Sequence, residues 1–103
     1  MSSPTQRTLA HLRAAGYPLV QVVERWNPYA RIRQDLFGII DVVAVGADIV
    51  CVQATSGSNV SQRVAKITES EALPILRKAG IRVLVHGWRK VRGRWSLREV
   101  DLS

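Results

Sequence analysis

The stretch Asp35–Asn59, DLFGIIDVVAVGADIVCVQATSGSN, decides the fold of this chain. It predicts two strands rich in valine and isoleucine, residues 37–45 and 49–55. A tight turn of Gly, Ala and Asp links them, so we predict an antiparallel hairpin. Two polar residues interrupt the apolar pattern, Asp41 in the first strand and Gln53 in the second.

The short turn sets a register that places Asp41 across from Gln53, on one face of the hairpin. Burying both side chains without a partner would cost several kcal/mol, on the order of 2–7 per group. One interpretation is that they hydrogen-bond each other or a backbone group at the edge of the sheet. The other is that their oxygens bind a hard cation such as Mg²⁺.

Polar residues on both sides of the hairpin favour the second interpretation. The sequence SGSN follows the second strand, and its backbone N–H groups can meet a phosphate. We expect Asn59, Arg63 and Lys66 to share one face of the next helix. Two arginines and Asp35 precede the first strand.

The rest of the chain predicts a single α/β domain, residues 1–103, with a mixed sheet flanked by helices. Ser3, Pro4 and Gln6 predict a capped helix that ends at Gly16. The further expectations are a strand around Val20–Glu24, a loop over residues 27–34, helices after Asn59 and after Ser70, and strands over residues 81–88 and 95–102.

Composition excludes several function classes. The chain has 103 residues, and no apolar run approaches the roughly 18 that a membrane span needs. No signal-peptide pattern is present, so we expect a cytoplasmic protein. The single cysteine excludes an internal disulfide and a Cys-rich zinc site. The net charge of +7 favours a polyanionic partner, most simply nucleic acid.

The order of these features resembles the PD-(D/E)XK nuclease superfamily, in the style of the small Holliday junction resolvases. It resembles more closely a group of small phage and bacterial proteins, and the resemblance covers nearly the whole chain. Its motifs are short and moderately specific, and they read here as DLFGIID at 35–41, QATSGSN at 53–59, RVAKI at 63–67 and GWRK at 87–90.

The resemblance implies a restriction-endonuclease-like αβββαβ core and a Mg²⁺ or Mn²⁺ site. Asp41 matches the metal-binding aspartate of the superfamily. Gln53 stands where an acidic ligand is usual, and Thr55 stands where a catalytic lysine is usual. Many members also carry a glutamate in the first helix, which this chain lacks. Gln53 keeps an oxygen ligand but lacks a negative charge, which predicts weaker metal binding, and Thr55 cannot stabilise charge as a lysine does.

Other residues can compensate for the departures. Glu24 and Asp35 are secondary candidates for the metal site, although each is more often a solvated surface charge. Lys66 is the candidate to replace the lysine, since the resemblance is to nucleases in some of which that lysine has migrated to this helix. Helix solubility or a contact with the DNA backbone is about as good an explanation for Lys66.

The prediction is therefore a metal-dependent nuclease acting on DNA, with branched DNA as a candidate substrate, in a bacterial or phage-infected cell. A symmetric homodimer is implied by resolvase-like members. One rival is a weakened nuclease fold that binds nucleic acid or a phage partner without cleaving, and another is a structural subunit. The predicted nucleic-acid contacts are Arg31, Arg33, Ser56, Ser58, Asn59, Arg63, Arg89 and Lys90. Trp88 and Trp95 are expected to pack, with base stacking as the alternative.

Overall fold

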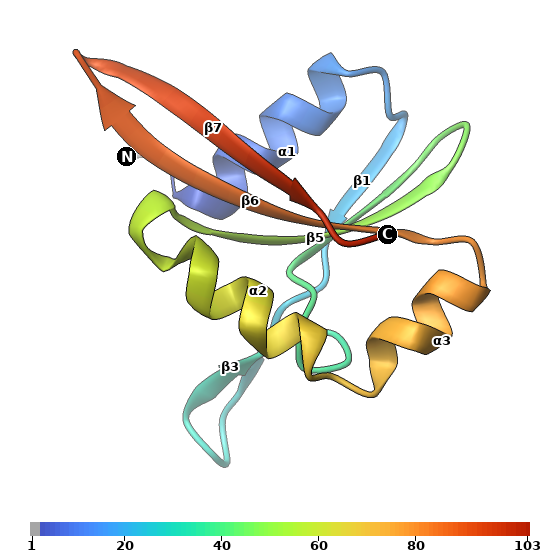
Figure 1. The fold of residues 1–103 in the computed structure, drawn as a ribbon. Coiled ribbons are helices and arrows are strands. Elements are labelled where there is room, and N and C mark those ends of the chain that lie inside the picture. Colours follow the sequence, from blue (N-terminus) through green and yellow to red (C-terminus); the bar gives the residue numbers. More distant parts are fainter. Residues whose placement is uncertain (1–2) are drawn as a thin grey trace.

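The computed structural model describes residues 3–103 and consists of helices on both faces of one mixed sheet, with a small separate hairpin (Figure 1). The elements are α1 (Pro4–Ala14), β1 (Leu19–Val22), β2 (Arg25–Asn27), β3 (Ile32–Gln34), β4 (Val42–Val45), β5 (Ile49–Ser56), a 3-10 turn η1 (Gly57–Asn59), α2 (Val60–Thr68), α3 (Ala72–Lys78), β6 (Arg82–Val91) and β7 (Arg94–Asp101).

The main sheet has the strand order β1-β4-β5-β6-β7. Strands β5 and β6 pair in parallel, while the other three pairs are antiparallel. A parallel pair needs a crossover, and α2 and α3 supply it. The predicted α/β class with a mixed sheet flanked by helices is confirmed.

Two apolar clusters lie on opposite faces of the sheet, because alternate residues of each strand point to opposite sides. Leu12 of α1 packs with Val50 and Val52 on one face. Cys51 packs on the other face with Ile67 of α2 and Leu73 of α3. Figure 1 shows this arrangement, with α1 on one side of the sheet and α2 and α3 on the other. Gln53 lies two residues after Cys51 on β5, so its side chain is on the same face of the sheet and points toward α2.

The first helix begins and ends as its sequence predicts. The Ser3 hydroxyl accepts a hydrogen bond from the backbone N–H of Gln6 at 3.2 Å, and Pro4 occupies the first turn. Gly16 follows the helix with φ of 98°, a conformation that costs glycine little.

The predicted loop over residues 27–34 was wrong in part. Residues 25–27 and 32–34 form the antiparallel hairpin β2–β3, which extends away from the main sheet (Figure 1). The turn predicted at Asn27-Pro28 is confirmed, since the Asn27 side chain accepts hydrogen bonds from the N–H groups of Tyr29 and Ala30. The flanking strands are short and exposed, and therefore lack the alternating apolar pattern by which strands are recognised.

The first two predicted strands were too long. Strand β1 ends at Val22, and strand β4 begins only at Val42. Residues 36–40 form a tight reversal in which Phe37 and Gly38 have positive φ. The run FGII looks like a strand because Ile39 and Ile40 are buried, but their burial comes from the turn being packed into the core.

The second half of the chain follows its predicted order, with small shifts of boundary. Strand β6 continues to Val91, so the turn to β7 is only Arg92 and Gly93, both at positive φ. Gly87 lies against the start of α2, where a Cβ atom would collide with Val60. This close contact fixes α2 against the sheet.

Candidate active site

Three chain reversals bring four polar side chains together. The β4–β5 pairing ends with Val42 opposite Val52, and the N–H group of Asp41 then donates to the Val52 carbonyl oxygen, which keeps Asp41 next to Gln53. Asp35 and Asp41 are the residues just outside the reversal that pairs Leu36 with Ile40. Glu24 and Asp35 are the residues just outside the last β2–β3 pair, Arg25 and Gln34. Each reversal therefore brings one further oxygen-bearing side chain close to the others.

The contacts agree with this construction. One carboxylate oxygen each of Glu24, Asp35 and Asp41 lie within 4.8 Å of one another. The Gln53 amide donates from Nε2 to Asp41 Oδ2 at 2.6 Å. The backbone N–H of Ala54 donates to the same oxygen at 2.9 Å. The predicted proximity of Asp41 and Gln53 on one face of the hairpin is confirmed.

Two oxygens of this cluster have no hydrogen-bond partner among the described residues. They are Asp41 Oδ1 and Gln53 Oε1, and both are buried. The residues themselves are only 3% and 2% exposed. The mutual hydrogen bond considered from the sequence thus exists, but it uses only one oxygen of the aspartate and the nitrogen of the amide. A buried acceptor without a partner costs about 1–3 kcal/mol, so a ligand that contacts these two oxygens would be favoured.

The electrostatics of Asp41 reflect the same crowding. Burial, followed by the neighbouring Asp35 carboxyl, raises the pKa of Asp41 to about 7. The Ala54 N–H group opposes this shift, and Glu24 adds to it. A carboxylate with such a raised pKa is stabilised in its charged form by a nearby cation.

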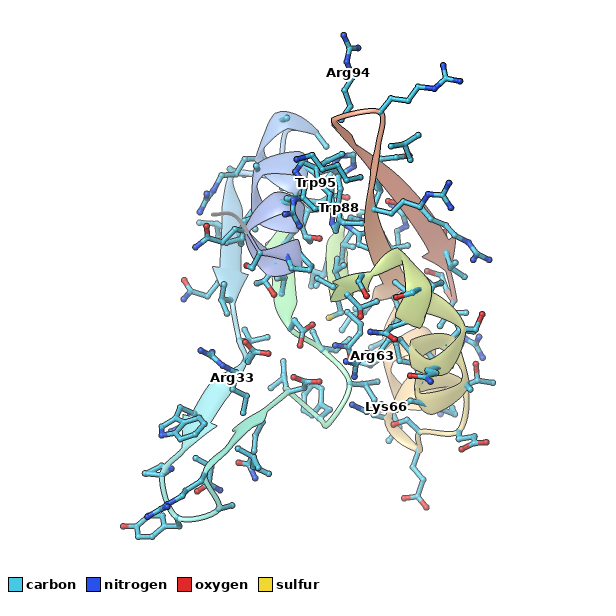
Figure 2. The ribbon with its side chains drawn as sticks, turned by 90° about the vertical axis from the view of Figure 1, so that its left-hand side faces the viewer. Arg33, Arg63, Lys66, Trp88, Arg94 and Trp95 are labelled. Atoms are coloured by element: carbon cyan, nitrogen blue, oxygen red, sulfur yellow. The ribbon has the colours of Figure 1, made fainter. Side chains whose placement is uncertain are left out.

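These side chains line a cleft of about 510 Å³, and cations lie around it. Arg33 comes from the β2–β3 hairpin, whereas Arg63 and Lys66 come from α2, on the other side of the cleft (Figure 2). Arg33 pairs with Glu24 at 3.2 Å, and Lys66 lies 3.6 Å from Asp35 Oδ2. Both ion pairs are partly exposed and contribute little to stability.

Thr55 also lines the cleft, buried and two residues beyond Gln53 on the same face. The N-terminal turn of α1 supplies Pro4 and Thr5 to the lining, and neither side chain carries a charge. The four predicted metal-site residues and the predicted Lys66 therefore lie in one cleft.

The predicted nucleic-acid residues divide into two groups. Arg33, Ser56 and Arg63 line the cleft. The other five do not line it. Ser58 and Asn59 lie just before α2 and are linked by hydrogen bonds to the Ser56 hydroxyl. Arg31 lies in the β2–β3 turn, and Arg89 and Lys90 lie on the exposed end of β6.

Sequence reasoning missed the Ala54 N–H group, the N-terminal turn of α1 and the hairpin that positions Glu24. The spacing of Glu24, Asn27-Pro28 and Asp35 is the signal that would have found the hairpin, because a turn midway between two acids brings them together.

A second group of titratable residues lies on the α1 side of the sheet. His86 is fully buried, and its ring nitrogens contact Glu99 Oε2 at 2.8 Å and Thr8 Oγ1 at 3.1 Å. The indole of Trp88 donates to the same Thr8 oxygen at 2.9 Å. The predicted packing role is thereby confirmed for Trp88. These groups satisfy one another and have the character of a structural network.

No family model, curated protein or solved structure matches this chain. Among the described residues, no helix has the length and apolar character required to cross a membrane.

Proposed function

We propose that this protein is a metal-dependent nuclease that hydrolyses DNA phosphodiester bonds. The observation that carries the proposal is the convergence of Glu24, Asp35, Asp41 and Gln53, with two buried oxygens unpaired, in a cleft bordered by cations. Branched or junction DNA is the substrate that the sequence resemblance suggests.

The order of elements supports the same proposal. Without the β2–β3 hairpin, and with α3 and β7 as additions, the chain runs α1, β1, β4, β5, α2, β6. This is the αβββαβ order of the restriction-endonuclease-like core. Asp41 lies directly before β4 and not within it, Gln53 lies on β5, and the two side chains are in contact.

The donor set fits a hard divalent cation. All four side chains offer oxygen, which Mg²⁺ and Mn²⁺ prefer, and no sulfur or imidazole lies among them. Glu24, Asp35, Asp41 and Gln53 would hold the ion, and the two unpaired oxygens would thereby gain a partner. Such an ion supplies a Lewis acid for the scissile phosphate and lowers the pKa of a bound water.

The chain itself contributes charge and position. Lys66 and Arg63 face the cleft from α2, where they neutralise negative charge that develops on the phosphate. Arg33 faces it from the opposite side and holds the DNA backbone. Thr55 offers a hydroxyl, which cannot replace the charge of a lysine, so we assign that role to Lys66.

A second candidate is a protein that binds DNA without cleaving it. Two residues favour it. Gln53 is uncharged where an acidic metal ligand is usual, and Thr55 stands where a catalytic lysine is usual. The same cleft would then hold a phosphate on Arg33, Arg63 and Lys66. A symmetric dimer stays a prediction under either candidate.

Cleavage assays on junction and linear DNA with Mn²⁺ separate the two candidates. We expect the wild type to cleave and Asp41→Ala to lose at least about 100-fold in rate, because removing a charge-stabilising group costs several kcal/mol. Asp101→Asn, which removes an exposed carboxylate of β7, is the matched control and should cleave normally. Cleavage that survives Asp41→Ala would refute the nuclease proposal, and binding without cleavage by the wild type would favour the second candidate.

A Gln53→Glu variant tests whether the amide limits metal binding. The substitution returns a carboxylate beside Asp41, so the affinity for Mn²⁺ is expected to rise about 10-fold. Titration calorimetry with Mn²⁺ measures this directly. An unchanged or weaker affinity would show that the Gln53 oxygen does not take part in the site.

A further inference from the structure

Two of the three tryptophans are exposed, and they differ in what covers them. Trp95 on β7 is 45% exposed, and the guanidinium of Arg7 lies over its ring, 3.2 Å from the centroid. Trp26 on β2 is 58% exposed, and among residues 3–103 no cation or aromatic ring stacks on it. Trp26 therefore offers an open ring face to solvent.

The hairpin register determines where this ring lies. Trp26 pairs directly with Arg33, and side chains of directly opposed residues lie on the same face of an antiparallel pair. Arg33 lines the candidate active-site cleft and contacts Glu24 there. Trp26 therefore extends the wall of the cleft outward, beyond the residues that line it.

We propose that Trp26 is a stacking platform for an unpaired nucleobase of the DNA substrate, next to the cleft. The inference rests on the proposed function and specifies its substrate class. Arg33 would hold the phosphate while the indole stacks on the adjoining base. Bases in a duplex are already stacked on each other, so the platform selects single-stranded or branched DNA over continuous duplex.

The charge around Trp26 argues for nucleic acid as the occupant. Arg25, Arg31 and Arg33 all belong to the hairpin, which has no acidic residue between Arg25 and Gln34. Aromatic rings interleaved with cations are the pattern by which single strands are bound without sequence preference. A second copy of this basic hairpin would be repelled, which makes self-association through this face the weaker alternative.

Fluorescence anisotropy in EDTA, where cleavage does not occur, tests the proposal with a labelled oligothymidylate and a labelled duplex. We expect Trp26→Ala to weaken binding of the single strand about 10-fold, in line with the worth of one stacked base. Duplex binding should change by less than about 2-fold. Trp26→Phe should retain most of the single-strand affinity, because any aromatic ring can stack. Trp95→Ala is the matched control and should bind as the wild type does, since its ring is already covered.

Several results would overturn the platform. One is equal single-strand affinity for Trp26→Ala and the wild type. Another is that Trp26→Ala loses affinity for the single strand and the duplex by the same factor, which would indicate a disturbed hairpin. A third is a dimer that Trp26→Ala converts to a monomer in size-exclusion chromatography, which would make this face a subunit interface. If the wild-type protein binds neither the oligothymidylate nor the duplex, the proposed function itself is refuted.

Discussion

Asp41 is the residue on which the site depends, and its position is unfavourable for stability. The side chain is buried, lies within reach of two other carboxylates and keeps one oxygen unpaired. Proteins retain such arrangements at functional sites, where a ligand compensates for the cost. The free energy of unfolding without metal should therefore rise when this charge is removed.

Asp41→Asn tests this cost through its pH dependence. The pKa of Asp41 is raised to about 7 in the folded state, against an ordinary value of 3.8. Between these values the folded state binds more protons than the unfolded state, so stability is lost as pH rises through about 7. We expect Asp41→Asn in EDTA to be more stable than the wild type by about 1–3 kcal/mol at pH 8 and about equal at pH 4.

Thermal unfolding by circular dichroism at the two pH values measures the difference. At pH 8 the melting temperature of Asp41→Asn should exceed that of the wild type by about 4–8 °C for each kcal/mol of added stability. The same variant should bind Mn²⁺ far more weakly, so stability and metal binding change in opposite directions. A variant that is less stable than the wild type at pH 8 would mean that Asp41 has a structural role.

At the scale of elements, α2 connects the fold to the site, because it carries Arg63 and Lys66 into the cleft. Its position against β6 depends on Gly87, whose hydrogen faces Val60. A methyl group at Gly87 must displace the start of the helix, since the collision is with a buried side chain.

Gly87→Ala is expected to destabilise the protein by about 1–3 kcal/mol, the usual cost of overpacking. Combining it with Val60→Ala should cost less than the sum of the two single changes, because the second substitution removes the colliding methyl groups. Urea denaturation of the three variants gives the coupling energy. Additive losses would show that Gly87 and Val60 do not set the position of α2.

The sequence predicted elements with long apolar patterns and missed those built from short polar ones. The β4–β5 turn and the proximity of Asp41 and Gln53 followed from turn length and alternation alone. The β2–β3 hairpin did not, because three-residue strands with exposed side chains carry no periodic signal. The reversal at residues 36–40 overlaps the strand predicted over residues 37–45, because buried isoleucines such as Ile39 and Ile40 occur in either structure.

That error concerned the segment that matters most for the site. A continuous strand would have carried Asp35 about six residues away from Asp41, whereas the reversal brings their carboxylate oxygens within 4.8 Å of each other. On sequence grounds Glu24 and Asp35 are only secondary candidates, because such residues are more often solvated surface charges. Their convergence required a tertiary contact between segments that each look unremarkable.

At the scale of the whole molecule, acidic side chains are concentrated in one cleft of a protein that is basic overall. The net charge is +7, yet three carboxylates gather in one cleft, and Arg33, Arg63 and Lys66 surround them. A basic protein with a localised acidic site suits a polyanion that approaches through its phosphates and meets a metal at one point.

DNA binding should therefore depend steeply on salt. If about four phosphates are contacted, the logarithm of affinity falls with a slope of about −3.6 against the logarithm of salt concentration. Arg33→Gln should make this slope shallower by about 0.9, while Arg13→Gln on the distant end of α1 should leave it unchanged. Salt titrations of duplex binding measure all three slopes. No binding at low salt would instead support a structural subunit without a nucleic-acid role.

The most direct test of the central claim is a crystal soaked in Mn²⁺ and measured at a wavelength that reveals the ion by anomalous scattering. We predict a peak bounded by Glu24, Asp35 and Asp41, within about 2.5 Å of Asp41 Oδ1, with the Gln53 carbonyl oxygen turned toward it. A soaked crystal with no peak in this cleft, or with Mn²⁺ only beside His86 and Glu99, would contradict the account.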